Sequence, residues 1–185
     1  MELLSEEEGR DAVRLARRTL EERIGGGNAP QPPSGAVFAD RRGVFVTLTI
    51  GGDLRGCIGY PYPVLPLGEA VREAAIAAAT GDPRFPPVTA AELPEITIEV
   101  TVLTVPAPLN GEPEDRAAGV IPGRHGLIVS GRGAGGLLLP QVATEYGWDA
   151  ATFLDHTCRK AGLPPGCWRR SDIDVLTFEG QIFHE

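Results

Sequence analysis

Asp53-Leu54-Arg55-Gly56-Cys57-Ile58-Gly59-Tyr60, the stretch DLRGCIGY, decides how the surrounding chain folds. Because successive side chains of a strand point to opposite faces, Arg55 and Cys57 are predicted to share one face. Leu54 and Gly56 then lie on the opposite face. Glycine weakens a strand unless another group must approach closely, so Gly56 and Gly59 predict a contact with a ligand or with the backbone of a second lobe.

The segments around this stretch predict an antiparallel sheet. VFVTLTI, residues 44–50, has an apolar residue at every second position, which indicates a strand with one buried face. Gly51-Gly52 is a two-residue turn signal, so this strand and DLRGCIGY are predicted to form a hairpin. EITIEVTVL, residues 95–103, alternates in the same way and is predicted to add a third strand.

Helices are predicted from capping signals and helical spacing. The sequence from Ser5 to Glu8 has the form of a capping box and opens a helix over residues 6–24, which a run of glycines ends. Pro66 opens a second helix that closes at Gly81. Two more helices are predicted at residues 140–146 and 149–161.

Two Pro-containing segments, residues 105–113 and 162–166, divide the chain into two predicted lobes. The segments GLIVS and GLLL between them, joined by GRGAG, indicate a hairpin, and IDVLTF and QIFHE after them indicate two more strands. The simplest fold is α+β. A larger lobe, residues 1–108 plus 167–185, holds a five-stranded antiparallel sheet built from both chain ends. A smaller lobe with a short antiparallel sheet and helices is inserted at 109–166, and a cleft is predicted between the lobes.

Composition disfavours several classes of function. Seventeen basic against 25 acidic residues give a formal charge of −8, the wrong sign for a nucleic-acid partner. No apolar run approaches the roughly 20 residues that cross a bilayer, and the acidic N-terminal segment is unlike a signal peptide, so a cytoplasmic protein is expected. The cysteines Cys57, Cys158 and Cys167 form no C-x-x-C pair, so free thiols are predicted rather than a disulfide framework or a zinc ribbon.

Six segments carry a resemblance to a known family: LRGCIGY, AAIAAATGDPRFPPV, ELPEITIEVTVL, GRHGLIV, GLLLPQVATEYGWD and FLDHTCRKAGLP. Their order and spacing resemble the AMMECR-one domain family from about residue 43 to residue 185, with LRGCIG as the signature. The resemblance implies a two-lobed α+β fold with two antiparallel sheets and a signature strand that faces the cleft. Through protein A of the AmmeMemoRadiSam system it also implies an association with Memo-like and radical-SAM proteins. It names no reaction.

Cys57 has two interpretations. A guanidinium from Arg55 close to the thiol would favour the thiolate and make Cys57 a nucleophile, and His125 in GRHGL would be its base if the lobes bring the two together. Alternatively, Cys57 is a small buried residue of a crowded strand. Cys57, His125 and Glu145 are possible metal ligands by type, but no two have a recognised ligand spacing, so no metal and no cofactor are predicted.

The remaining candidates are binding residues. Arg84 in the loop DPRF is placed to bind a carboxylate or phosphate, or to pair with Asp82 or Glu99. Glu99 is interpreted as the partner of an arginine or as a general base. Gln141 and Glu145 are four residues apart on one predicted helix, where they line the cleft or face solvent.

Three functions follow from these features. The first is a binding module, whose cleft has the LRGCIG strand as its floor and holds a peptide, a protein segment or a metabolite. The alternatives are a thiol-dependent hydrolase or transferase that uses Cys57, or a metal or redox partner in a radical-SAM-associated pathway. The sequence leaves open whether the protein is an enzyme.

Overall fold

The computed structural model describes residues 3–26 and 30–185, and the chain divides into two compact units. The first unit ends at Thr104 and also contains Gln181–Glu185, whereas the second is Val105–Gly180. Each unit combines helices with one antiparallel sheet, so the predicted α+β class is confirmed. None of the helices in the described residues is both long and apolar enough to cross a bilayer.

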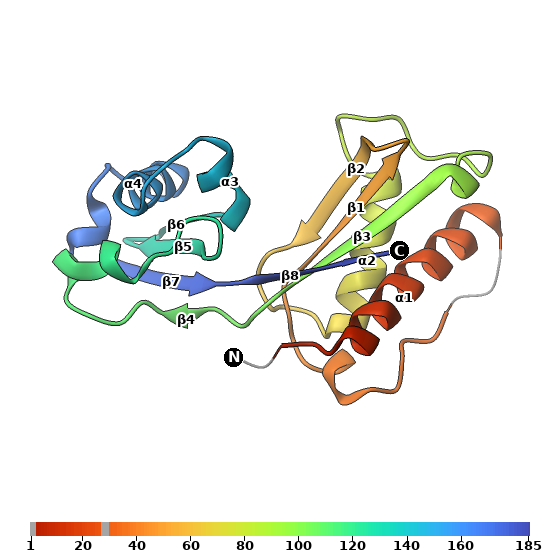
Figure 1. Ribbon diagram of the computed structural model, residues 1–185, viewed down its shortest axis with the longest axis horizontal. Coiled ribbons are helices and arrows are strands. Elements are labelled where there is room, and N and C mark those ends of the chain that lie inside the picture. Colours follow the sequence, from red (N-terminus) through yellow and green to blue (C-terminus); the bar gives the residue numbers. More distant parts are fainter. Residues whose placement is uncertain (1–2, 27–29) are drawn as a thin grey trace. The chain divides into compact units, whose positions relative to one another are not determined.

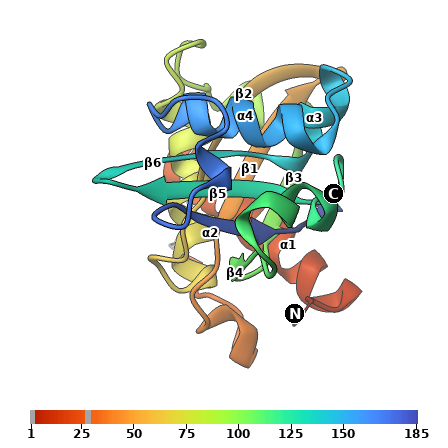
Figure 2. The same cartoon turned by 90° about the vertical axis from the view of Figure 1, so that its left-hand side faces the viewer.

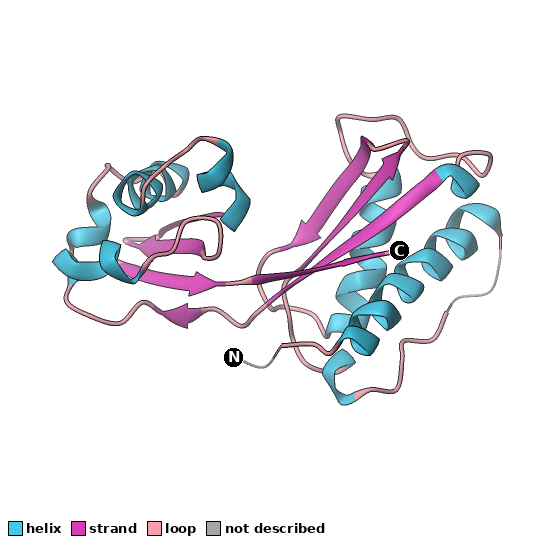
Figure 3. Ribbon diagram, viewed as in Figure 1, coloured by secondary structure: helices cyan, strands magenta, loops and turns pink. Residues whose placement is uncertain are grey.

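In the first unit, two helices pack on one face of a sheet with the strand order β2-β1-β3-β8 (Figures 1 and 3). Its elements are α1 (Glu6–Gly25), η1 (Ala36–Phe38), β1 (Val44–Ile50), β2 (Asp53–Tyr60), α2 (Leu67–Thr80), η2 (Leu93–Glu95), β3 (Ile96–Leu103) and β8 (Gly180–His184). The predicted capping box at Ser5 is present at the start of α1.

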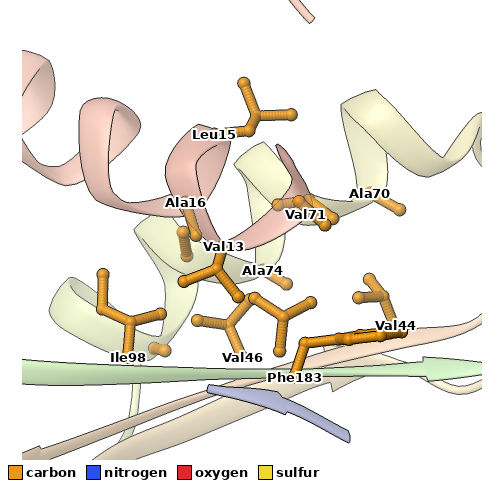
Figure 4. Close-up of a cluster of buried hydrophobic side chains, with 14 of the residues drawn as sticks. Val13, Leu15, Ala16, Val44, Val46, Ala70, Val71, Ala74, Ile98 and Phe183 are labelled. Carbon is orange, nitrogen blue, oxygen red and sulfur yellow. The ribbon is translucent and has the colours of Figure 1, made fainter. Parts of the chain in front are cut away.

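Burial of alternate strand residues forms the core of this unit. Val44, Val46 and Ile98 are fully buried against apolar residues of both helices, among them Val13 and Val71 (Figure 4). A strand that hides every second side chain in this way turns the others to the opposite face of the sheet. That second face carries Cys57 and is the basis of the candidate site.

The second unit has a sheet with the order β4-β7-β5-β6, and helices α3 and α4 cover one face of it (Figure 2). Its elements are β4 (Ala107–Pro108), η3 (Pro113–Gly119), β5 (Gly126–Gly131), β6 (Ala134–Leu138), α3 (Pro140–Glu145), α4 (Ala150–Lys160), η4 (Cys167–Arg169) and β7 (Asp174–Phe178). The predicted hairpin is therefore present as β5 and β6, with Ala134 paired to Gly131 at its turn.

The predicted five-stranded sheet is not confirmed, because each sheet of the described residues has four strands. Of the two C-terminal strands, only β8 joins the first sheet, whereas β7 pairs with β4 and β5 of the second. The physical reason lies in β5, whose residues from Gly126 to Val129 are all buried. A strand buried on both faces belongs in the interior of a sheet with a neighbour on either side, and β7 is that second neighbour.

Cys158 and Cys167 form a disulfide, so the prediction of three free thiols is wrong. The chain leaves α4 through a loop and returns in η4, which brings the two Cα atoms to 6.1 Å. A separation of nine residues matches no short cysteine motif, and the sequence therefore gave no signal for this bridge. Cys57 is the free cysteine.

Reduction of this disulfide is expected to lower the free energy of unfolding of the second unit by about 2.5 kcal/mol, the loop-entropy value for a ring of this size. Both tryptophans of the chain, Trp148 and Trp168, lie in this unit. Urea unfolding followed by tryptophan fluorescence, with and without reductant, measures the change. The double variant Cys158→Ala/Cys167→Ala is the control, in which reductant should have no effect. An unchanged wild-type midpoint after complete reduction would contradict the expectation.

Candidate functional site

A β-bulge at Arg55 changes the predicted alternation of β2. Leu48 of β1 pairs with Gly56, but the next residue, Thr49, pairs with Leu54. Arg55 is therefore the extra residue of a bulge, and Leu54 lies on the face opposite Gly56. The prediction that Leu54 and Gly56 share a face is wrong for this reason.

The two glycines of the signature are needed for close approaches within the first unit. A Cβ atom on Gly56 would lie 2.1 Å from the carbonyl oxygen of Ala78 in α2, and one on Gly59 would lie 2.5 Å from the ring of Phe45. Both distances are far inside van der Waals contact. Gly56 thus allows β2 and α2 to pack backbone against backbone.

Cys57 belongs to a row of polar residues on the sheet face that is turned away from α1 and α2. Its Sγ lies 3.2 Å from Oγ1 of Thr47, and Cys57 is a partly exposed residue. Thr47 pairs with Cys57 on one side and with Glu99 on the other. His184 extends the row, because its Nδ1 lies 3.5 Å from Oε2 of Glu99. We call these four residues the polar row.

The loop after α2 holds the backbone of Cys57 at the edge of the sheet. β2 is an edge strand, so its outward backbone groups lack a partner strand. Oδ2 of Asp82 accepts a hydrogen bond from the Cys57 N–H at 2.9 Å, and Nη2 of Arg84 donates to the Cys57 carbonyl oxygen at 3.3 Å. Two side chains thus take the place that a neighbouring strand would occupy.

Asp82 and Arg84 also pair with each other, as one of the sequence alternatives predicted. Nε and Nη2 of Arg84 lie 2.9 and 2.7 Å from the two carboxylate oxygens. The hydrogen bonds from the Arg84 side chain hold the pKa of Asp82 well below its usual range, and the Cys57 N–H adds to this effect. The Asp82 side chain is 2% exposed and that of Arg84 is 53% exposed. A buried carboxylate therefore fixes an exposed cation beside Cys57.

Arg55 makes internal contacts. Its Nε lies 2.8 Å from Oε1 of Glu92, and its Nη1 donates to the carbonyl oxygen of Pro86 at 2.9 Å. The hydrogen bond from Arg55, followed by those from the N–H and hydroxyl of Thr89, lowers the pKa of Glu92 to about 2. Arg55 thus connects the bulge to the loop between α2 and η2. The arginine beside Cys57 with an exposed guanidinium is Arg84.

His184 is a contributor to this site that the sequence analysis does not predict. Glu99, which was predicted to be the partner of an arginine or a general base, lies beside this histidine instead of an arginine. The period of two in QIFHE indicates that His184 shares a face with Ile182, but only the strand order places it beside Glu99. The bond from Asp82 to the Cys57 backbone is a tertiary contact for which the sequence carries no local signal.

His125 lies in the second unit, where local groups engage its ring. Nδ1 accepts a hydrogen bond from the Ile121 N–H at 3.1 Å, and Nε2 lies 4.0 Å from Oε1 of Glu179. These contacts hold the turn before β5. The predicted pairing of His125 with Cys57 stays a prediction.

The other predicted residues of the second unit, Gln141 and Glu145, are exposed at the two ends of α3. Their exposure is compatible with either sequence alternative. Over residues 3–26 and 30–185, no cluster of three or more His, Cys, Asp or Glu side chains has the arrangement of a metal site.

The site combines the thiol of a partly exposed cysteine, a fixed cation and a row of hydroxyl, carboxylate and imidazole groups. Such a surface offers one strong anion contact and several hydrogen-bond donors and acceptors. His184 is three strand spacings from Cys57, about 14 Å, which is too far for it to remove the thiol proton directly. Within the first unit, the polar row therefore offers contacts for recognition, and His184 is not placed to act as the direct base of Cys57.

Comparison with known proteins agrees with this fold. Residues 13–183 match the AMMECR1 family. A protein of Methanothermobacter thermautotrophicus is 56% identical over 98% of this chain and 96% of its own length. One of Methanosarcina mazei is 51% identical over 99% of this chain and 94% of its own length. The crystal structure of the uncharacterized protein PH0010 from Pyrococcus horikoshii superimposes with a TM-score of 0.82 at 46% identity, covering 98% of this chain and 93% of that one. The chain belongs to the AMMECR1 family.

Proposed function

We propose that the polar row and Arg84 form a binding surface for a peptide, a protein segment or a metabolite that carries an anionic group. The observation that carries this proposal is the pairing of buried Asp82 with exposed Arg84. A guanidinium that is already fixed loses little side-chain entropy when it binds a carboxylate or phosphate. The thiol of Cys57, a partly exposed residue, lies beside it.

The sequence adds two elements to this proposal. The signature strand is the floor of a cleft between the lobes, and Memo-like and radical-SAM proteins are partners through the family association. A cytoplasmic location fits such partners. These elements rest on the resemblance and on the hydropathy pattern of the chain.

The charge of the alkylating reagent tests the proposal without a known ligand. Under non-reducing conditions Cys57 is the free thiol, so alkylation reports on this site. Iodoacetate is an anion and iodoacetamide is neutral, so the ratio of their rates measures the local potential. Arg84→Gln is expected to lower this ratio about threefold to tenfold, the Coulomb effect of about 0.7 to 1.4 kcal/mol from one largely solvent-screened charge at roughly 6 Å.

Two controls sharpen this measurement. Arg23→Gln removes an equal charge from an exposed position of α1 and should leave the ratio of the iodoacetate and iodoacetamide rates unchanged. Millimolar phosphate or succinate should slow the reaction of iodoacetate in the wild type more than in Arg84→Gln. An unchanged ratio in Arg84→Gln would sink the proposal, as would a Cys57 thiol that reacts only after denaturation.

A further inference from the structure

Helix α1 runs alongside the edge strand β8 in the same direction. At its start, the backbone N–H of Leu4 donates to Oε1 of Gln181 at 2.7 Å, and Nε2 of Gln181 donates back to the Leu4 carbonyl oxygen at 3.1 Å. A Cβ atom on Gly9 would overlap the ring of Phe183. Further on, Arg17 hydrogen-bonds the side chain of Glu185 through Nε at 2.8 Å. Contacts between α1 and β8 therefore extend along the whole length of the strand.

A hollow of about 440 Å³ lies between these two elements. It is lined by Arg10, Val13, Arg14, Arg17, Arg18, His184 and Glu185. We call it the arginine groove. Its volume is within the usual range of ligand sites. Its four arginines outnumber the carboxylates of Asp11 and Glu185 that pair with two of them, so the groove is basic although the whole chain carries a formal charge of −8.

The arginines differ in what they contact. Arg17 is used internally, because it also donates to the carbonyl oxygens of Leu93 and Ile96. Arg14 pairs with Asp11. Arg10 and Arg18 are exposed and make no ion pair within the described part of the chain. Both guanidinium groups are therefore available to an anion that enters the groove.

The backbone of β8 supplies a second feature of the groove. β8 is the last strand of its sheet, and the Glu185 N–H donates to Ile98 of β3 at 3.1 Å. In an antiparallel pair the backbone groups of alternate residues point toward and away from the partner strand. The N–H and C=O groups of Ile182 and His184 therefore point outward at the edge, and His184 lines the groove.

We propose that the arginine groove binds an extended acidic segment of a partner protein, which adds to β8 as a fifth strand. Arg10, Arg14 and Arg18 are four residues apart, so they repeat about every 6 Å along the helix. Every second side chain of an extended strand repeats about every 6.8 Å. Glutamates or aspartates at alternate positions of the added strand would therefore meet successive arginines, while its backbone pairs with Ile182 and His184.

The arginine side chains and the unpaired backbone edge of β8 together favour an extended acidic segment over a single small anion. A phosphate or dicarboxylate would use one or two guanidinium groups and leave the strand edge unpaired. The same charges also exclude basic or neutral segments, because exposed cations along an edge discourage unspecific pairing. This surface shares His184 with the polar row but uses its backbone at the strand edge, so the proposal does not depend on the function proposed for Cys57 and Arg84.

A fluorescein-labelled octapeptide in which glutamate alternates with threonine tests the proposal by anisotropy. The double variant Arg10→Gln/Arg18→Gln is expected to weaken its binding at least about tenfold, through the loss of charge-assisted hydrogen bonds. These two arginines make no ion pair in the described residues, so the variant should fold normally. The matched control Arg23→Gln/Lys160→Gln removes two exposed charges elsewhere and should bind as the wild type does.

Two further measurements test whether the peptide adds to β8 as a strand. Amide hydrogen exchange at Ile182 and His184 should slow when the peptide binds, and a peptide with alternate N-methylated amides should bind weakly. Equal binding of a lysine–threonine octapeptide would overturn the proposal. Full competition by millimolar phosphate or succinate, together with unchanged exchange at these two amides, would also overturn it and assign the groove to small anions.

Discussion

Replacement of Gly56 by alanine is expected to destabilise the first unit by about 3 kcal/mol or more, at the upper end of overpacking effects. The new methyl group would lie 2.1 Å from the Ala78 carbonyl oxygen. That oxygen belongs to the backbone of α2, so no side-chain rotation relieves the overlap. The strand and the helix must separate, which opens the core that both elements bury.

Urea unfolding followed by far-ultraviolet circular dichroism measures this effect, since both tryptophans lie in the other unit. Gly135→Ala is the matched control. It also lies in a strand, but a Cβ atom there would have its nearest neighbours at an ordinary 3.8 Å. Its stability should change little. A Gly56→Ala protein as stable as the control would show that β2 and α2 are not packed as described.

Gly56 also shows how far the sequence predicts this fold. Alternation and glycine content correctly predicted a hairpin strand with a close contact, but the predicted partner was a ligand or the backbone of the second lobe. They did not identify the approaching element, which is α2 of the same unit. Local periodicity fixes which residues of a strand share a face, but the partner in a close contact depends on tertiary packing.

The features that the sequence did not predict correctly share one physical cause. The bulge at Arg55, the placement of β7 in the second sheet and the Cys158–Cys167 disulfide all depend on pairings between segments that lie apart in the chain. The strand propensity of a segment does not show which other strand it pairs with. It depends on the side chains that pack against the strand after the sheet has formed. The pairing of Arg84 with Asp82 was predictable because only two residues separate them.

Replacement of Asp82 by asparagine is expected to cost about 3 kcal/mol at neutral pH, the lower end of the range for breaking a buried ion pair, since Arg84 is half exposed. Its two carboxylate oxygens accept hydrogen bonds from the N–H of Cys57 and from the N–H and guanidinium of Arg84. An asparagine has one oxygen, and its amide would direct N–H groups at donors. Urea unfolding followed by far-ultraviolet circular dichroism measures the loss. The control is Asp172→Asn, which removes an exposed carboxylate that also pairs with two arginines and should change stability little.

The cost of Asp82→Asn should depend on pH with a predictable sign. Arg84 holds the pKa of Asp82 in the folded protein well below its usual range. The unfolded chain therefore takes up a proton on Asp82 first, near pH 4, as pH falls. The stabilisation from this carboxylate is fully present above that value and is lost as pH falls toward the folded-state pKa.

Glu92, whose pKa is also lowered, titrates in both proteins and cancels in the difference. The gap in unfolding free energy between wild type and Asp82→Asn should thus be constant from about pH 7 to about pH 5 and narrow at about pH 3. A gap of constant size down to about pH 3 would mean that Asp82 stabilises the loop by shape rather than by charge, and the fixed cation beside Cys57 would lose its physical basis.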